Sequence, residues 1–333
     1  MPTNNAFFRI AVLDDYQNVA LAMANWSVLD GRATVTVFND TLADTDAVVT
    51  RLQPFDIVCV MRERTPMSRA VISRLPKLRL IASTAPRNAS IDLQAASERG
   101  IEVVHTGYSS NPTIELTWAL ILASCRNIAA ENASFRAGGW QRFIGADLKG
   151  KKLGVLGLGN IGGSVAKIGK AFGMEVIAWS ENLTTQLATE AGAVLVSKEE
   201  LFRQADIITI HLVLSSRTRG LVGTKELALM KPSARLVNTS RGPIVVEADL
   251  LAALRGAKIA GAALDVFDEE PLPPNHPFRG LPNLLATPHI GYVSHDLYTR
   301  FYQDTVDNIR RWCTARTNPR GHGLVGAGRQ WGL

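Results

Sequence analysis

The sequence predicts an α/β protein built from two doubly wound parallel-sheet domains. Two observations lead to this fold class. Strand-like apolar runs alternate with helical patterns along most of the chain, and one such run ends in a glycine-rich turn that opens a helix. The chain has 333 residues, enough for about two domains of ordinary size.

The first domain is predicted to be flavodoxin-like and to span residues 1–105. Strands are predicted at 8–13, 35–38, 56–61, 78–83 and 101–105, with helices at 45–52 and 68–75. A helix at 296–312 is expected to return to this domain, so that residues 295–333 complete it. The stretch 316–333 has little apolar periodicity and is expected to be a loosely ordered tail.

The second domain, a Rossmann-type fold, is predicted at 106–294 as an insertion into the first. A long helix is expected from Asn111, and Gly138-Gly139-Trp140 interrupts its pattern. The predicted buried stripe of this helix is Leu116, Ala119, Leu120, Ala123 and Ile128. Strands are predicted at 153–156, 175–179, 193–196, 206–212, 234–238, 259–266 and 284–286, with helices at 197–205 and 246–256.

The glycine-rich turn Gly157-Leu-Gly-Asn-Ile-Gly162 is typical of a dinucleotide site. The first glycine permits a tight turn, Gly159 lets the backbone approach a pyrophosphate, and Gly162 lets the helix pack close to the strand. Backbone N–H groups at the start of the helix favour an anion. The strand before the turn and the helix after it support this interpretation over a plain strand-to-helix connection.

The coenzyme is predicted to be NAD or NADP, and NAD is favoured. Rossmann domains that bind NAD usually carry Asp or Glu at the end of the second strand, where it binds the ribose hydroxyls. Here that position is Ser180, and Glu181 follows it. Glu181 could bind the ribose one position later, and its charge would repel the 2′-phosphate of NADP.

Polar residues follow successive predicted strands of the second domain. Arg241 comes after one strand, an acidic stretch from Asp265 to Glu270 after the next, and His289 after the last. The carboxyl ends of parallel strands meet at one rim, which also carries the glycine turn. Taken singly, each residue is more often structural or solvated; together they indicate a catalytic site.

Five motifs carry a resemblance to a known family. They are Gly157-Leu-Gly-Asn-Ile-Gly, Ala171-Phe-Gly-Met, Asn238-Thr-Ser-Arg-Gly, Ala263-Leu-Asp-Val-Phe and Thr287-Pro-His-Ile-Gly. In this order they resemble the D-isomer-specific 2-hydroxyacid dehydrogenases, which include phosphoglycerate dehydrogenases and glyoxylate/hydroxypyruvate reductases. The resemblance implies an NAD(P)-dependent oxidoreductase that interconverts a 2-oxo acid and a D-2-hydroxy acid, with reduction as the expected direction.

Specific roles follow from the resemblance. It implies that His289 is the acid/base, that Glu270 is its partner and that Arg241 binds the substrate. The residues expected to bind the cofactor are Gly157, Gly159, Asn160, Ile161, Gly162, Ser180, Glu181, His211, Val213, Thr218, Thr239, Ser240, Asp265 and Gly291. Asp265 is expected on the nicotinamide side. No metal is predicted.

The substrate contacts are expected at two polar strand ends of the first domain. The candidates are Arg62, Arg64, Ala85, Arg87 and Asn88. Many family members have a glycine-rich turn where this chain has Thr84-Ala85-Pro86-Arg87, and Pro86 has no N–H to offer a carboxylate. The three arginines could receive a second anionic group of the substrate, or they could pair with Glu63 and other nearby acids.

Composition and charge bound the remaining function classes. Net charge is +6, but Lys and Arg are scattered without a basic run, which argues against nucleic acid as a partner. No apolar run suits a membrane span, and no secretory signal is visible. Cys59, Cys125 and Cys313 are far apart and lack metal spacing. Cys59 and Cys125 lie in apolar runs and are interpreted as buried free thiols, so a cytoplasmic location is expected.

Other functions stay open at this stage. One is a non-catalytic, corepressor-like protein that senses NAD(H); another is a dehydrogenase of the phosphite or formate type. The resemblance also implies a homodimer joined through the nucleotide-binding domain. The segment from Asn111 to Gly139, with Trp118 and Trp140, is the candidate contact, unless its apolar face packs within its own chain.

Overall fold

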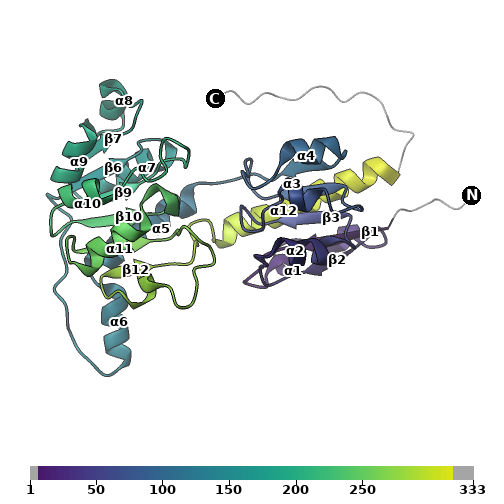
Figure 1. The fold of residues 1–333 in the computed structure, drawn as a ribbon, viewed down its shortest axis with the longest axis horizontal. Helices are drawn as coiled ribbons and strands as arrows, with labels where there is room; N and C mark the ends of the chain where they lie inside the picture. Colours follow the sequence, from purple (N-terminus) through teal and green to yellow (C-terminus); the bar gives the residue numbers. More distant parts are fainter. Residues whose placement is uncertain (1–6, 318–333) are drawn as a thin grey trace, which may run out of the picture. The chain divides into compact units, whose positions relative to one another are not determined.

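The computed structural model describes residues 7–317, and within them the chain forms two compact units. One unit contains residues 7–109 and 295–317, and the other contains residues 110–294 (Figure 1). The tail predicted at 316–333 begins too early, because residues 316 and 317 belong to a helix; from residue 318 onward it lies outside the described residues. No helix of residues 7–317 has the length and apolar character that a bilayer crossing requires.

The first unit contains a parallel sheet of five strands among its described residues, in the order β2-β1-β3-β4-β5. The strands are β1 (Phe8–Val12), β2 (Ala33–Val37), β3 (Ile57–Val60), β4 (Leu80–Ser83) and β5 (Glu102–His105). This order reverses direction between β1 and β3, as in flavodoxin-like sheets. The central strands β3 and β4 are buried throughout, which explains their continuous apolar sequence.

Helices cover both faces of this sheet. They are α1 (Ala20–Met23), the 3-10 turn η1 (Trp26–Leu29), α2 (Thr45–Leu52), α3 (Arg69–Ile72), α4 (Leu93–Glu98) and α12 (His295–Thr317). Helices α2, α3 and α4 pack on one face, around Val48, Ile72 and Ala95. Helix α12 returns to the same unit, where the ring of Trp312 lies 5.0 Å from that of Phe8.

The second unit contains a parallel sheet of seven strands within residues 110–294, in the order β12-β11-β10-β9-β6-β7-β8. The strands are β6 (Lys152–Leu156), β7 (Glu175–Trp179), β8 (Val194–Leu195), β9 (Ile207–Ile210), β10 (Arg235–Asn238), β11 (Gly261–Leu264) and β12 (Leu284–Ala286). Strand β6 lies between β7 and β9, where the strand order reverses, so the chain after β6 leaves the sheet at its ligand-binding switch point. The predicted fold class, two doubly wound parallel sheets, is confirmed.

Helices also cover both faces of the second sheet. They are α5 (Asn111–Cys125), α6 (Ile128–Arg136), α7 (Asn160–Ala171), α8 (Thr185–Glu190), α9 (Lys198–Gln204), α10 (Thr224–Leu229) and α11 (Glu247–Arg255), with 3-10 turns η2 (Gly242–Ile244) and η3 (Pro277–Gly280). Helices α5 and α7 share one core with Val155 and Ala263. Helices α9, α10 and α11 enclose the other, around Phe202 and Leu236.

The prediction of a long helix from Asn111 is wrong about the length of the helix and about part of its buried stripe. It ends at Cys125, because Asn127 adopts a left-handed backbone with φ of 53°, and α6 begins after it. Ile128, expected in the stripe, is 55% exposed, and Ala119 is exposed as well. The buried face is formed instead by residues such as Ile114, Trp118 and Ile121.

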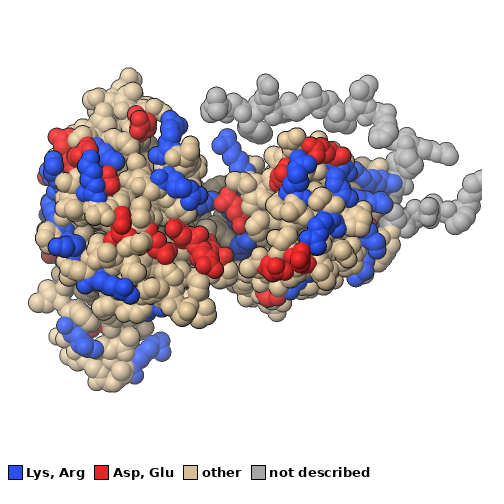
Figure 2. Space-filling view, in the orientation of Figure 1, with Lys and Arg blue, Asp and Glu red and all other residues tan. Residues whose placement is uncertain are grey.

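Charged side chains of both signs are spread over the surface. Figure 2 shows Lys and Arg interspersed with Asp and Glu on the visible face of each unit. This distribution agrees with the scattered charge of the sequence. Cys59 and Cys125 are buried free thiols, as predicted, and Cys313 is a buried free thiol as well.

Candidate active site

The carboxyl ends of five strands of the second sheet lie in register. Residue pairing aligns Leu156 with Ile210, Ile210 with Asn238, Asn238 with Leu264, and Leu264 with Ala286. The residues that follow these strands therefore emerge along one rim. They include the glycine turn, His211, Arg241, Asp265 and His289.

The glycine turn has the geometry that a dinucleotide requires. Gly157 has φ of 101°, a left-handed conformation, and a Cβ on Gly162 would lie 2.0 Å from the Gly157 carbonyl oxygen. Gly159 is exposed, with open space where its Cβ would be. No described side chain caps the N-terminus of α7, so its first N–H groups are available to a pyrophosphate. These residues fit a dinucleotide coenzyme.

The other residues at the start of α7 and the end of β7 have distinct environments. Asn160 donates through Nδ2 to the Ser110 hydroxyl at 3.1 Å, and Ile161 is half-buried. The Ser180 hydroxyl accepts the N–H of Leu158 at 3.1 Å and so supports the glycine turn from the neighbouring strand. Glu181 is exposed directly after it.

The loop after β9 is held by hydrogen bonds between its own residues. The Thr218 hydroxyl donates to the Val213 carbonyl at 2.7 Å and accepts the Ser215 N–H at 2.8 Å. The Val213 side chain is 83% exposed. His211 contacts the Thr209 hydroxyl through Nε2 at 2.9 Å, and burial lowers the pKa of its ring to about 3. His211 is therefore neutral across the physiological range.

His289 and Glu270, predicted as acid/base and partner, are in direct contact. Nδ1 of His289 lies 2.5 Å from Oε2 of Glu270, and the second carboxylate oxygen of Glu270 accepts the Phe267 N–H at 2.9 Å. The side chains are 29% and 33% exposed. The Tyr292 ring packs edge-on at 5.5 Å from the imidazole. Because Nδ1 faces the carboxylate, Nε2 is the nitrogen left for a reacting group.

Asp265 supports the turn that carries His289. Its Oδ1 accepts the Thr287 hydroxyl at 2.6 Å and the Ile290 N–H at 2.8 Å, and its Oδ2 accepts the Gly291 N–H at 2.7 Å. Burial raises the pKa of the Asp265 carboxyl, although these hydrogen bonds and the His289 charge oppose the shift. The turn places His289 in a left-handed conformation, with φ of 53°.

Arg241 is held by the turn after β10. Asn238 donates through Nδ2 to the Arg241 carbonyl at 2.9 Å and accepts the Ser240 N–H at 3.0 Å. The Ser240 hydroxyl donates to the Leu212 carbonyl, and the Thr239 hydroxyl lies 2.8 Å from that of Thr117. Asn238 and Thr287 are not among the predicted site residues, although both lie within the family motifs.

The predicted substrate residues of the first unit are largely occupied by their own chain. Ala85 is buried in a left-handed conformation, and its N–H donates to the Thr106 hydroxyl at 2.8 Å. Asn88 donates to the Arg62 carbonyl at 2.5 Å and to the Ser83 hydroxyl at 3.1 Å. The structure therefore joins Asn88 to Arg62 at the ends of β3 and β4.

The three arginines of this region differ. Arg64 donates to the Asp14 carbonyl at 2.8 Å, and its guanidinium lies 4.5 Å from the centre of the Tyr16 ring. The Arg62 guanidinium lies 5.4 Å from the centre of the Tyr108 ring. Arg87 is exposed.

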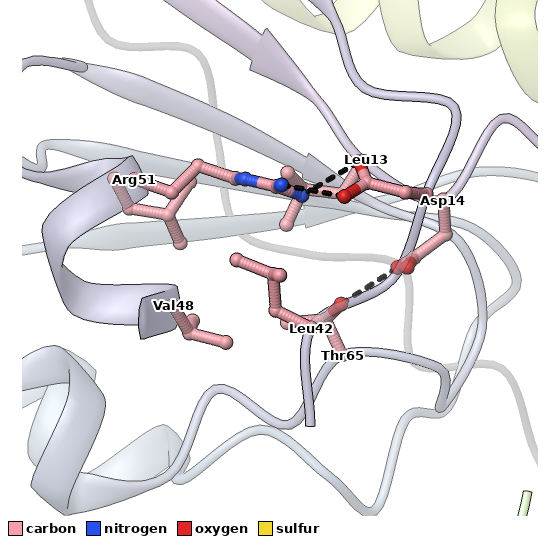
Figure 3. A pocket seen from close by; sticks show the side chains of 8 residues that line it. Leu13, Asp14, Leu42, Val48, Arg51 and Thr65 are labelled. Atoms are coloured by element: carbon pink, nitrogen blue, oxygen red, sulfur yellow. Dashed lines mark hydrogen bonds and ion pairs between the residues drawn. The ribbon is translucent and has the colours of Figure 1, made fainter. Parts of the chain in front are cut away.

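A small cavity beside these residues does not suit the substrate. The Thr65 hydroxyl donates to the buried Asp14 carboxylate at 2.8 Å in its wall (Figure 3), and Arg51, which also lines it, pairs with Asp40 at 2.7 Å. The cavity volume is about 10 Å³, room for roughly one water molecule. Asp14 joins three segments there, since the Thr41 hydroxyl donates to its other oxygen at 2.5 Å.

Known proteins resemble the chain over most of its length. Residues 118–291 match the model of the D-isomer specific 2-hydroxyacid dehydrogenase NAD-binding domain. A glyoxylate reductase of Aeropyrum pernix is 41% identical over 259 residues, covering 75% of this chain and 77% of that protein. A D-3-phosphoglycerate dehydrogenase of Methanocaldococcus jannaschii is 43% identical over 238 residues, which is 70% of this chain and 45% of that longer protein.

Solved structures agree. The crystal structure of a phosphoglycerate oxidoreductase from Vibrio cholerae superposes with a TM-score of 0.87 at 37% identity, covering 92% of this chain and 99% of that one. The sequence, the glycine turn and the two parallel sheets therefore lead to one conclusion. The chain belongs to the D-isomer specific 2-hydroxyacid dehydrogenases, a family of oxidoreductases with an NAD-binding domain.

Proposed function

We propose that the protein reduces a 2-oxo acid to a D-2-hydroxy acid, with His289 as the acid/base. The observation that carries this proposal is the 2.5 Å contact between His289 Nδ1 and Glu270 Oε2 on the rim that also bears the glycine turn. Relatives named glyoxylate reductase and hydroxypyruvate reductase support the same reaction class.

The chemistry needs a hydride at the carbonyl carbon and a proton at the carbonyl oxygen. NAD(P)H, when bound, supplies the hydride. Glu270 accepts a hydrogen bond from Nδ1–H of His289, which fixes the orientation of the ring and stabilises the imidazolium. Nε2 of His289 then donates its proton to the oxygen that becomes the hydroxyl, and takes it back in the reverse direction. Arg241 binds the substrate carboxylate through its planar guanidinium.

NAD is the coenzyme that the second unit suits better. Glu181 is exposed directly beyond Ser180, the position that follows the second Rossmann strand. A carboxylate there accepts hydrogen bonds from ribose hydroxyls and repels a 2′-phosphate.

The test is NADH or NADPH oxidation with purified protein and a panel of 2-oxo acids that carry one or two anionic groups. Turnover is expected, faster with NADH, and His289→Asn should lower kcat on the order of a thousandfold while coenzyme still binds. A folded His289→Asn variant with normal turnover would remove His289 from this role. Tight coenzyme binding without any turnover by the wild type would favour a sensor.

The same proposal includes a homodimer formed through the second unit. Trp118 does not take part, because it is buried and stacks on Phe172 at 5.0 Å within its own chain. The contact we propose is the α6 segment, residues 128–144, which runs from α6 into the following loop. Large apolar side chains exposed along it are Ile128, Phe135, Trp140, Phe143 and Ile144. A cytoplasmic location suits the three buried free thiols.

A further inference from the structure

A second histidine–carboxylate pair lies in the same unit as His289 and Glu270. Nε2 of His276 is 2.9 Å from Oε1 of Glu247. The side chains are 15% and 28% exposed, so the pair is better shielded from water than the proposed catalytic pair. Glu247 is the first residue of α11, and His276 directly precedes η3.

The hydrogen bonds of His276 fix its tautomer. The backbone N–H of Phe278 donates to Nδ1 at 3.3 Å, and an amide N–H can only donate. Nδ1 therefore carries no proton, and the proton of the neutral ring sits on Nε2, directed at Glu247. His276 both caps η3 and donates to α11, which joins two segments that are distant in sequence.

Each of these segments also carries a residue of the proposed site. The stretch from Phe267 to Phe278 contains Glu270, and the two phenylalanine rings pack with centroids 6.5 Å apart. The Phe278 ring also packs edge-on against His276, at 5.0 Å. Because the Phe267 N–H binds the Glu270 carboxylate, a shift of this stretch moves the partner of His289.

The other segment, from Arg241 to Glu247, lies against the first through its backbone. A Cβ on Gly242 would lie 2.1 Å from the Phe267 carbonyl carbon, which leaves no space for any side chain. The two segments thus touch beside Arg241 at one end. The Glu247–His276 pair joins them at the other.

We propose that the Glu247–His276 pair is a positioning device for the reaction: it holds the Glu270 stretch against the Arg241 stretch, so that Glu270 and Arg241 keep a fixed separation. This inference rests on the proposed function. Neither residue is proposed to touch the substrate or the coenzyme. A small displacement of a catalytic group lowers the turnover rate more than the binding affinity, since a displacement on the order of 1 Å can lower turnover about a hundredfold.

The experiment compares His276→Asn, Glu247→Ala and Glu247→Gln with the wild type. Asn at 276 keeps an acceptor for the Phe278 N–H but cannot reach Glu247, so it removes the pair and spares the cap. We expect His276→Asn and Glu247→Ala each to lower kcat about tenfold with little change in the KM of NADH. Glu247→Gln keeps an acceptor oxygen and should restore most of the rate. The double variant His276→Asn with Glu247→Ala should lower kcat no further than either single variant does, because both substitutions remove the same contact.

Lys231→Met is the matched control. Lys231 pairs with Asp206 at 2.8 Å in the same unit, and Asp206 directly precedes β9, at the opposite end of the strands from Arg241. This variant should lower Tm without lowering kcat. If His276→Asn lowers Tm as Lys231→Met does and leaves kcat unchanged, the pair is only structural and the inference is overturned. If His276→Asn only raises the KM of NADH and leaves kcat unchanged, the inference is overturned as well.

A readout without turnover separates this inference from the proposed function. The ¹⁵N shifts of the imidazole report whether the proton of His276 sits on Nε2, and exchange of the Glu270-stretch amides should speed up in His276→Asn. A wild type that binds NADH but turns over no 2-oxo acid fails the proposed function. A proton on Nδ1 of His276, or unchanged amide exchange of the Glu270 stretch in His276→Asn, would contradict the positioning role of the Glu247–His276 pair.

Discussion

Asp265 supports the turn that carries His289. Its carboxylate accepts hydrogen bonds from Thr287, Ile290 and Gly291 on both sides of the histidine. Asp265→Asn replaces one accepting carboxylate oxygen by an NH2 group, which can only donate, so we expect kcat to fall on the order of a hundredfold. Thr287→Val removes one of these bonds and should lower kcat in the same direction by less.

These variants also separate two roles for Asp265. The family resemblance places it on the nicotinamide side, in which case Asp265→Asn would chiefly weaken NADH binding while Thr287→Val would not. Steady-state kinetics with varied NADH and varied 2-oxo acid measure both quantities. A rise in the KM of NADH in Asp265→Asn alone, without a fall in kcat in either variant, would contradict a positioning role.

The sequence is sufficient to locate Arg241, Glu270 and His289, because each follows a recognisable strand and parallel strands end at one rim. It does not reveal the hydrogen bonds that orient them. His289 adopts a left-handed backbone conformation, with φ of 53°, that the sequence does not indicate because the position is not a glycine. The bonds of Asp265 depend on that turn, and the occupied N–H of Ala85 depends on Thr106, which follows another strand.

His211 predicts a pH effect on stability. Burial lowers its pKa to about 3 from an ordinary value of 6.5. Between these values the unfolded chain binds the proton and the folded chain does not, so the contribution of His211 to stability is greatest above pH 6.5 and falls with acid. The slope for one proton is about 1.4 kcal/mol per pH unit. His211→Gln should flatten the fall in unfolding free energy between pH 6.5 and 4, measured by urea denaturation without coenzyme; an unchanged slope would contradict it.

Among the elements, the turn between β6 and α7 allows a controlled test with adjacent glycines. A Cβ on Gly162 would meet the Gly157 carbonyl oxygen at 2.0 Å, whereas a Cβ on Gly163 meets nothing within 4 Å. Gly162→Ala should displace the start of α7 from the turn and weaken NADH binding by tenfold or more, a loss of about 1.4 kcal/mol at least. Gly163→Ala should bind NADH as the wild type does and gain slightly in Tm from better helix propensity.

Fluorescence titration with NADH measures both variants. Equal affinities would show that the close approach of Gly162 to the turn does not shape the coenzyme site. The turn is also the element that sequence reasoning locates most accurately, because glycine spacing reports backbone geometry directly. The helix from Asn111 is the opposite case: Asn127 ends α5 through its backbone conformation, which the apolar pattern across that position does not record.

At the scale of the whole molecule, the order of strands and helices was predictable because each sheet is buried on both faces and leaves continuous apolar runs. The surface of the proposed homodimer is harder to predict. The pattern of the α5 face indicated Trp118, but this ring is buried by Phe172. Exposure instead marks the α6 segment, which projects from the rest of the second unit in Figure 1.

The α6 segment makes the homodimer testable with single charges. Ile144 is 99% exposed and Phe135 is 65% exposed, so an aspartate at either position loses few contacts within the chain but places a charge in the proposed apolar contact between copies. Sedimentation velocity should show a dimer for the wild type and monomers for Ile144→Asp combined with Phe135→Asp. Leu187→Asp is the control, because Leu187 is 53% exposed on α8, outside the segment, and should leave the dimer intact. A dimer that survives the double variant, or a monomeric wild type, would mean that the apolar side chains of this segment do not join two copies.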